Sequence, residues 1–203
     1  MSIFGKSYGT NISGQLFIEG KEVHLNTVHD AISHKIAYVT EDRKGNGLIL
    51  SNPIRVNTTL ANMGAVSSHG VIDKDKEYMV AVEYKDKLKT KCPGVEQNAG
   101  NLSGGNQQKV LLAKWMFTEP DILILDDSSS ALDYKTDAAL RKELREHFAE
   151  TTCVIIAQRI SSIMNSDHIM VLEDGQMIGY GTHQELMETC EIYREIGKSQ
   201  MGI

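Results

Sequence analysis

The sequence predicts an α/β protein with a mostly parallel sheet, flanking helices, a small N-terminal antiparallel β part and a helical subdomain. Two observations carry this prediction. The continuous apolar run Ile122–Leu125 ends in two aspartates, which is typical of a strand buried on both faces of a parallel sheet. A segment of helical length and charge, Lys135–Ala149, then separates it from the apolar run Cys153–Ala157, giving the rhythm of a βαβ unit.

The N-terminal segment favours short strands. Gln15–Ile18, a turn at Glu19-Gly20 and Val23–Leu25 suggest one edge of a small sheet, and Ile36–Val39 predicts a further strand. Polar residues rich in Gly and Asn follow from Glu41 to Asn52.

Two helices are expected in the middle of the chain. Asp73–Lys91 has the length and mixed charge of an exposed helix. The Gly/Ser/Asn-rich segment Gly100–Gly105 predicts a loop, and Asn106–Phe117 carries apolar residues at helical spacing until Pro120-Asp121 ends it. A loop should therefore lead directly into the start of a helix.

Beyond the βαβ unit, His168–Leu172 predicts a third buried strand, and Asp174-Gly175 a turn before Gln176–Tyr180. Thr182 and Glu185 have the spacing of a capping box, which predicts that the last helix begins there.

Composition excludes several classes of protein. The 203 residues suit one domain, and 41% hydrophobic with 24% charged residues is ordinary for a soluble globular chain. No apolar run approaches the about 20 residues that cross a bilayer, so no membrane span is expected. The net charge of −6 without a Lys/Arg cluster argues against nucleic acid as a partner. Three widely spaced cysteines and the lack of an export signal favour the cytoplasm.

The strongest functional signal is Asn101–Lys109, which reads Asn-Leu-Ser-Gly-Gly-Asn-Gln-Gln-Lys, followed 21 positions after Gly105 by Asp126 at the end of a predicted strand. Ser103 can offer a hydroxyl, and Gly104 and Gly105 let backbone N–H groups approach an anion at a helix N-terminus. An isolated Ser-Gly-Gly would more often be a simple helix cap. The downstream strand and aspartates favour a phosphate-contacting loop.

Together these segments resemble the signature motif and Walker B strand of ATP-binding cassette (ABC) proteins, and Ser130–Asp133 resembles their D-loop. The resemblance covers nearly the whole chain and implies a truncated P-loop NTPase (ABC ATPase) fold. It implies that ATP is contacted by Ser103, Gly104, Gly105, Gln107, Glu41 and Asp133. It further implies one ABC ATPase domain over residues 1–203, with a helical subdomain at about 42–105 and the Walker B, D-loop and switch part at about 106–203.

The resemblance also assigns residues to the chemistry of hydrolysis. Asp126 corresponds to the carboxylate that holds Mg²⁺, a hard cation that prefers oxygen ligands. Asp127 stands where active members carry a glutamate that polarises the attacking water, and Gln158 stands where they carry a histidine. Since a positioned acid or base is worth about 10²–10⁴ in rate, both departures imply slow local hydrolysis. Glu41 is a third departure, from the glutamine of the Q-loop.

A phosphate-gripping P-loop, Gly-x-x-x-x-Gly-Lys-Ser/Thr between a strand and a helix, is not found in the sequence. Gly5-Lys6-Ser7 imitates its last three residues, but no glycine stands five positions earlier and no strand precedes it. The isolated chain is therefore expected to bind ATP weakly or not at all. The resemblance gives Asp126 as the expected Mg²⁺ site. No histidine pair has ligand spacing with a Cys or carboxylate partner, so no other metal site is expected.

The two parts of the chain resemble different branches of the family. Residues 1 to about 115 resemble the second cassette of bacterial ribose, galactose and xylose importers, through Asn11–Gly20, Ala37–Leu50 and Leu102–Trp115. From about residue 121 the chain resembles the cassette of multidrug-type exporters, through Asp126–Asp133, Ala157–Ile163 and Gly181–Gly202. A recombinant chimera and an unusual natural subfamily both account for this pattern.

The resemblance implies a subunit that couples ATP binding and hydrolysis to solute transport, of the sugar import type by its N-terminal half. Its partners would be a second cassette, bound head to tail, and a transmembrane permease, which places it in the cytoplasm at the inner face of the membrane. Two alternatives stay open: an exporter-type cassette, and a non-catalytic fragment or interaction module that contributes only its signature motif to a partner.

Overall fold

The computed structural model describes residues 3–5, 12–127 and 134–201. The chain divides into two compact units, Met1–Ile156 and Ala157–Ile203. No described helix is both long enough and apolar enough to span a bilayer.

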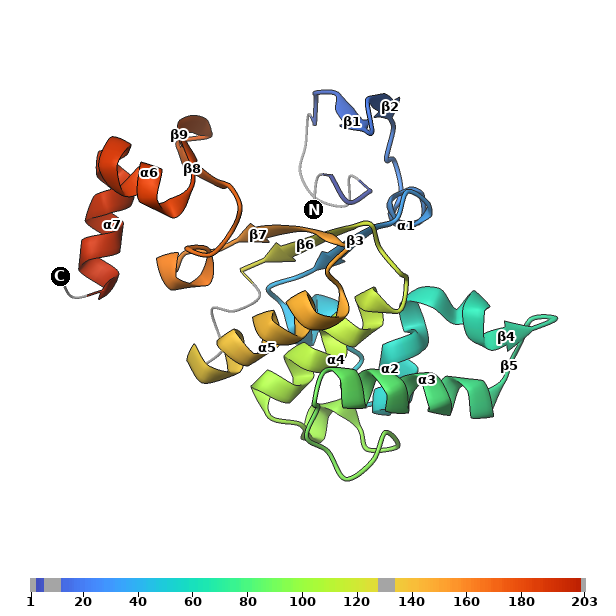
Figure 1. Ribbon diagram of the computed structural model, residues 1–203. Coiled ribbons are helices and arrows are strands. Elements are labelled where there is room, and N and C mark those ends of the chain that lie inside the picture. The colour runs from blue at the N-terminus through green and yellow to red at the C-terminus, as the bar shows by residue number, and fades with distance from the viewer. Residues whose placement is uncertain (1–2, 6–11, 128–133, 202–203) are drawn as a thin grey trace. The chain divides into compact units, whose positions relative to one another are not determined.

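The N-terminal unit is built on a three-stranded parallel sheet in the order β3, β6, β7. The strands are β3 (Ile36–Val39), β6 (Ile122–Asp126) and β7 (Thr152–Ile156). All four residues of β3 and the middle of β6 are buried, as the continuous apolar runs predicted. Helices α4 (Gly104–Met116) and α5 (Tyr134–His147) cover one face of this sheet (Figure 1).

Strand β7 differs from the prediction that Cys153–Ala157 is a buried strand. Its residues are mostly exposed, with Val154 at 46% and Ile156 at 51%. β7 is also the edge strand of this sheet: it pairs with β6 on one side, and among the described residues no strand pairs with its other side. An apolar run does not tell a central strand from an edge strand.

The residues before β3 form a small antiparallel hairpin and one short helix. Strands β1 (Leu16–Ile18) and β2 (Lys21–Val23) pair around the Glu19-Gly20 turn, in which both residues have positive φ. Helix α1 (Val28–Ser33) begins at a capping box in which Thr27 and Asp30 bond to each other's backbone. Phe4 is buried and stacks on Tyr38, which joins the start of the chain to the core.

A mainly helical region links β3 to α4. It contains the π-helical turn η1 (Arg43–Gly47), α2 (Ile54–Thr59), the 3₁₀ segment η2 (Leu60–Val66), the strand pair β4 (Ser67–Ser68) and β5 (Val71–Ile72), α3 (Lys74–Lys87) and the 3₁₀ turn η3 (Ala99–Asn101). The helix expected over Asp73–Lys91 is confirmed as α3, which Asp73 caps and which ends at Lys87 rather than Lys91. Buried Glu77 of α3 accepts hydrogen bonds from Arg55 and Thr59 of α2, so an ion pair holds the two helices together.

The C-terminal unit contains η4 (Ile160–Ser162), β8 (Ile169–Glu173), β9 (Gln176–Gly181), α6 (His183–Thr189) and α7 (Glu191–Met201). The capping box of Thr182 and Glu185 opens α6, as predicted. The strand predicted at His168–Leu172 is confirmed as β8, but the prediction that it is buried was wrong. β8 pairs antiparallel with β9 around the Asp174-Gly175 turn, and most of its side chains are exposed.

Candidate nucleotide-contacting site

The loop Ser103–Gly105 forms the start of α4. Ser103 is the N-cap, with extended backbone, and helical geometry begins at Gly104. No side chain caps the helix, so the first backbone N–H groups of a 13-residue helix are not satisfied by a capping residue. The helix dipole places positive charge at this end. The loop therefore leads directly into the start of a helix, as the sequence predicted.

The hydroxyl of Ser103 is oriented by its neighbour. Its Oγ accepts a hydrogen bond of 2.9 Å from Nδ2 of Asn106, whose Oδ1 accepts from the backbone N–H of Lys91 at 2.9 Å. Because Oγ already accepts from Asn106, the proton of the Ser103 hydroxyl is available to donate. Ser103 is exposed, so a donor aimed at an incoming anion fits this position.

Gln107 faces the protein interior. The side chain is 5% exposed, and its Nε2 donates to the backbone oxygens of Ala99 and Leu102 at 3.3 and 3.2 Å. These bonds tie the turn η3 to α4. In this structure Gln107 therefore holds the loop that carries Ser103.

Asp126 lies at the C-terminal end of β6, where the side chain is partly exposed. The hydroxyl of Tyr38 on β3 donates to its Oδ2. Burial of Tyr38, together with the hydrogen bond to Asp126, raises the pKa of the Tyr38 hydroxyl far above its usual value, so it stays protonated and remains a donor. Tyr38 thereby fixes the orientation of the Asp126 carboxylate.

Asp127 follows the strand in a left-handed conformation with φ of 39°, which an aspartate tolerates better than most residues. Its backbone N–H donates to the oxygen of Ile156 at 2.9 Å, and the residue is 8% exposed. The sharp turn carries the chain out of the sheet immediately after Asp126. The two carboxylates are thus placed by different backbone geometries at one end of the sheet.

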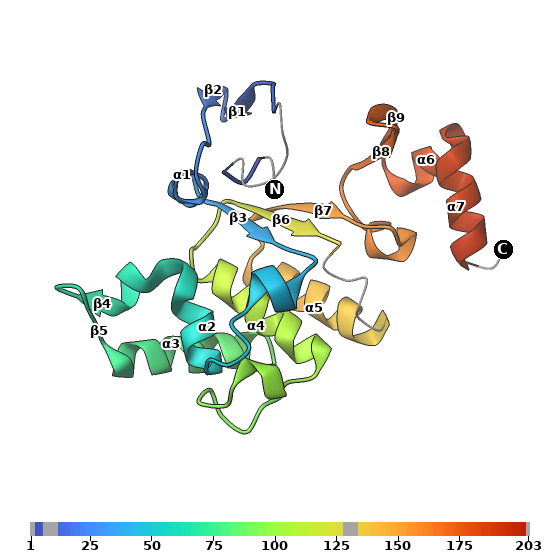
Figure 2. The ribbon, with the colours of Figure 1, turned by 180° about the vertical axis from the view of Figure 1, so that it is seen from behind.

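The start of α4 and the end of β6 lie on the same side of the N-terminal unit. α4 runs back along the sheet before the chain enters β6, so the first turn of the helix and the last residue of the strand point the same way (Figures 1 and 2). The elements therefore bring Ser103, Gly104 and Gly105 to the side of the unit from which Asp126 and Asp127 emerge.

Glu41 follows β3 and is exposed, in the segment that leads into η1. This turn packs on α4: Lys114 donates from Nζ to the backbone oxygen of Gly47 at 2.7 Å, and a Cβ on Gly47 would lie 3.0 Å from Leu111. Burial lowers the pKa of Lys114 to about 8. The segment after β3 is consequently anchored on the helix that carries the Ser103 loop.

Two further expected site residues are not placed by this arrangement of the N-terminal unit. Gln158 belongs to the C-terminal unit, where its side chain is exposed and its backbone oxygen accepts from Gln200 of α7 at 2.8 Å. Asp133 and the rest of the D-loop candidate lie outside the described residues. Of the segment that imitates a P-loop, Gly5 is described, and it lies in a turn with φ of 75°.

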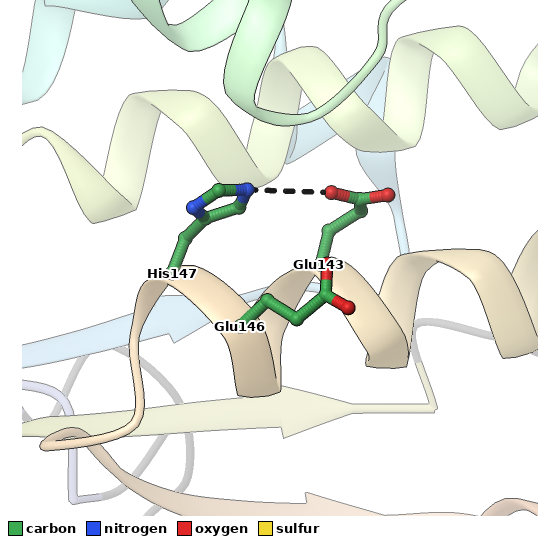
Figure 3. Close-up of side chains that lie close together, drawn as sticks. All are labelled: Glu143, Glu146 and His147. Carbon is green, nitrogen blue, oxygen red and sulfur yellow. Dashed lines mark ion pairs between the residues drawn. The ribbon is translucent and has the colours of Figure 1, made fainter.

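One group of side chains has the composition of a metal site. Glu143, Glu146 and His147 of α5 present ligand atoms within 4.8 Å of one another (Figure 3). Glu143 is buried and already accepts from Lys89, and its other oxygen lies 3.5 Å from Nε2 of His147. Lys89 lowers the pKa of Glu143, followed by weaker effects of His147 and Lys109. The neighbouring cations balance this carboxylate, so we assign it a structural role.

Asp126 fits the chemistry expected of a Mg²⁺ ligand. It offers a partly exposed carboxylate at the C-terminal end of a parallel strand, and Tyr38 is its hydrogen-bond donor among the described residues. Neither Tyr38 nor Lys114 was predicted from the sequence, and neither was the inward position of Gln107. An available signal for Tyr38 was the polar group of a tyrosine inside an otherwise apolar buried strand, which requires a partner.

Comparison with known proteins gives the family. Residues 2–130 match the ABC transporter family model. The chain is 42% identical over 187 residues to the L-arabinose transport ATP-binding protein AraG of Geobacillus stearothermophilus, covering 91% of this chain and 36% of that protein. It is 36% identical over 180 residues to a xylose import ATP-binding protein, XylG, of Thermoanaerobacter pseudethanolicus, covering 88% and 35%.

The fold is also shared with a solved structure. A bacterial Atm1-family ABC exporter with ATP bound matches 98% of this chain and 34% of that chain, with a TM-score of 0.75 and 24% sequence identity. The importer match covers 91% of this chain, so the likeness to importers extends into the second half. The chain spans about a third of the length of these relatives. It belongs to the ABC transporter family and has the α/β fold of an ABC nucleotide-binding domain.

Proposed function

We propose that this chain is an ATP-binding cassette of a sugar importer, in which the start of α4 contacts a triphosphate that another segment grips. The observation that carries the proposal is the uncapped first turn of α4, with Ser103 exposed beside it and its hydroxyl proton free to donate. The arabinose and xylose transport proteins named above support the class of solute.

The grip on the nucleotide comes from outside these 203 residues, because the sequence holds no Gly-x-x-x-x-Gly-Lys-Ser/Thr. A second cassette, bound head to tail, would supply it, and a permease would complete the transporter at the inner face of the membrane. In this proposal residues 1–203 form one ABC ATPase domain, with its helical subdomain at about 42–105 and its Walker B, D-loop and switch part at about 106–203.

Asp126 would hold Mg²⁺, which when bound neutralises charge on the phosphates. Tyr38 keeps that carboxylate in one orientation. Asp127 and Gln158 would take the places of the water-polarising glutamate and the switch histidine, and Glu41 and Asp133 would complete the nucleotide site. Gln107, expected from the sequence to contact ATP, faces inward and would support the site by holding the Ser103 loop. Because Asp127 is one methylene shorter than glutamate, hydrolysis at the site that it serves is expected to be slow.

The test mixes the purified chain with a second cassette that has a P-loop but whose own signature loop has been inactivated by mutation. Calorimetry should detect no micromolar binding of Mg-ATP to the isolated chain. ATP occlusion in the mixture should appear with the wild-type chain and be lost with Ser103→Arg, which fills the helix start. A matched control is Ser67→Arg, at a residue outside the site. Micromolar ATP binding by the chain alone, or equal occlusion with Ser103→Arg, would contradict the proposal.

A further inference from the structure

We propose that Arg43 is a further residue of the anion-contacting site at the start of α4, where its guanidinium binds the same phosphate oxygens that meet the Ser103 loop. This inference rests on the proposed function and extends it. Arg43 lies 60 positions before Ser103 in the sequence, and the fold brings the two regions together.

The contact with Gly104 places the guanidinium. Arg43 opens the turn η1, which lies in front of α4 in Figure 2. A Cβ built on Gly104 would lie 2.9 Å from Nη2 of Arg43 and 3.5 Å from its Cζ. The guanidinium therefore occupies the space that a side chain at position 104 would need. Because Gly104 has no side chain, the guanidinium of Arg43 can lie against the start of α4.

The charge of Arg43 is not balanced by the protein around it. Its Nε is buried without a hydrogen-bond partner, and no carboxylate of the described residues lies within ion-pair distance of its guanidinium. The neighbouring Asp42 is engaged elsewhere, because its Oδ1 accepts from the backbone N–H of Gly45 at 2.9 Å. Arg43 is partly exposed, so a ligand can reach it.

The position is electrostatically unfavourable without an anion. Cations stabilise the C-terminal ends of helices and are repelled by the partial positive charge at the N-terminal end. Arg43 nevertheless lies against the first residue of α4. An anion bound between the guanidinium and the helix start would interact favourably with both. Other cations of this unit have partners within the protein: buried Lys114 donates to Gly47, and Arg55 pairs with Glu77 and Glu96.

The chemistry of the groups indicates a phosphate chain as the ligand. A guanidinium presents a planar fork of N–H donors that matches two oxygens of a phosphate. The hydroxyl of Ser103 and the backbone N–H groups of the first turn of α4 supply further donors. No acidic side chain is needed or offered among these groups, which excludes a cation as the occupant.

The experiment is a titration of the ¹⁵N-labelled chain with sodium triphosphate, followed by NMR. The amide signals of Gly104 and Gly105 should shift, and Arg43→Gln should raise the dissociation constant about tenfold, as expected for a charge-assisted hydrogen bond. Lys44→Gln is the matched control: this lysine carries the same charge in the same turn and is exposed, so its loss should change the constant less than about twofold by general screening.

Arg43→Lys covers the case in which Arg43→Gln disturbs the turn. It retains the charge without the fork, and its constant should lie between those of the wild type and Arg43→Gln. If the two amides shift equally well in wild type, Arg43→Gln and Arg43→Lys, or if Lys44→Gln weakens binding as much as Arg43→Gln, the role of Arg43 is refuted while the proposed function stands. If triphosphate shifts neither amide in the wild type, both the role of Arg43 and the contact by the Ser103 loop are refuted.

Discussion

Lys114 shows at the scale of a residue how a single hydrogen bond permits a charge in the core. It is 8% exposed, donates from Nζ to Gly47 and lies 4.9 Å from the ring centre of Trp115. Burial lowers its pKa to about 8, because the charged form loses hydration that one carbonyl and one ring replace only in part. The native state therefore releases this proton at lower pH than the unfolded chain.

Replacing Lys114 by Met should change how stability depends on pH. Between about pH 8 and about pH 10.4 the unfolded wild type binds more protons than the native state, so its free energy of unfolding should rise with pH. Relative to Lys114→Met the rise should be at most about 3 kcal/mol. Urea unfolding at pH 7 and pH 10 measures it, with Lys44→Met as the control that should follow the wild type. Equal pH dependence of wild type and Lys114→Met would contradict the buried position of this charge.

The residues of the site differ in how far the sequence could predict them. Ser103 and Asp126 stand at element boundaries that the sequence marks, with a Gly-rich loop before a helix and an aspartate after an apolar run. Tyr38 and Arg43 act through contacts with residues 88 and 61 positions away, Asp126 and Gly104. Contacts between residues so far apart in the sequence depend on how β3, β6 and α4 pack together. No local sequence pattern predicts that packing.

At the scale of elements, the packing of η1 on α4 connects the turn that carries Arg43 with the helix that begins after Ser103. Gly47 is buried, and a Cβ there would lie 3.0 and 3.2 Å from the two methyl groups of Leu111, which is itself fully buried. A close-packed interior leaves these methyl groups little room to move. The distance between turn and helix is therefore set by the absence of a side chain at Gly47.

Gly47→Ala should destabilise the N-terminal unit by about 1–3 kcal/mol, because the added methyl group overpacks the contact with Leu111. Gly64→Ala is the matched control, since a Cβ at Gly64 meets no atom within 4 Å, and it should be neutral or slightly stabilising. Chemical denaturation of both variants gives the two free energies. A Gly47→Ala variant as stable as Gly64→Ala would show that η1 and α4 are not in close contact.

Elements themselves were predicted more accurately than their pairing. The apolar runs located β3 and β6, the length and mixed charge of the segment located α3, and the capping-box spacing of Thr182 located the start of α6. The burial of β7 and β8 was predicted wrongly, since a run of apolar residues gives a strand but not its neighbours. The π-helical turn η1 was not expected, because its polar Gly- and Asn-containing sequence is equally typical of a loop.

At the scale of the whole chain, two separate hydrophobic cores correspond to the two units. The larger core gathers residues of β3, β6, α4 and α5 around Leu111 and Leu123. The smaller one consists of Ile160, Ile169, Leu186, Cys190 and Tyr193. The C-terminal unit, 47 residues from Ala157 to Ile203, is below the size at which a single core supplies more than about 3–5 kcal/mol. It should be the less stable of the two units.

Leu186→Ala should separate the unfolding of the two units. Leu186 is 1% exposed, so its truncation should cost about 2–5 kcal/mol, enough to unfold a unit of this size. Hydrogen exchange should then reveal lost protection in peptides from β8 and β9. Trp115, the single tryptophan, lies in the larger core, so its fluorescence reports the N-terminal unit and its transition should stay within about 0.5 kcal/mol of the wild type. Leu111→Ala should shift the Trp115 transition by about 2–5 kcal/mol. If Leu186→Ala moved that transition equally, the two cores would unfold as one cooperative structure, and residues 157–203 would depend on the same packing as the sheet.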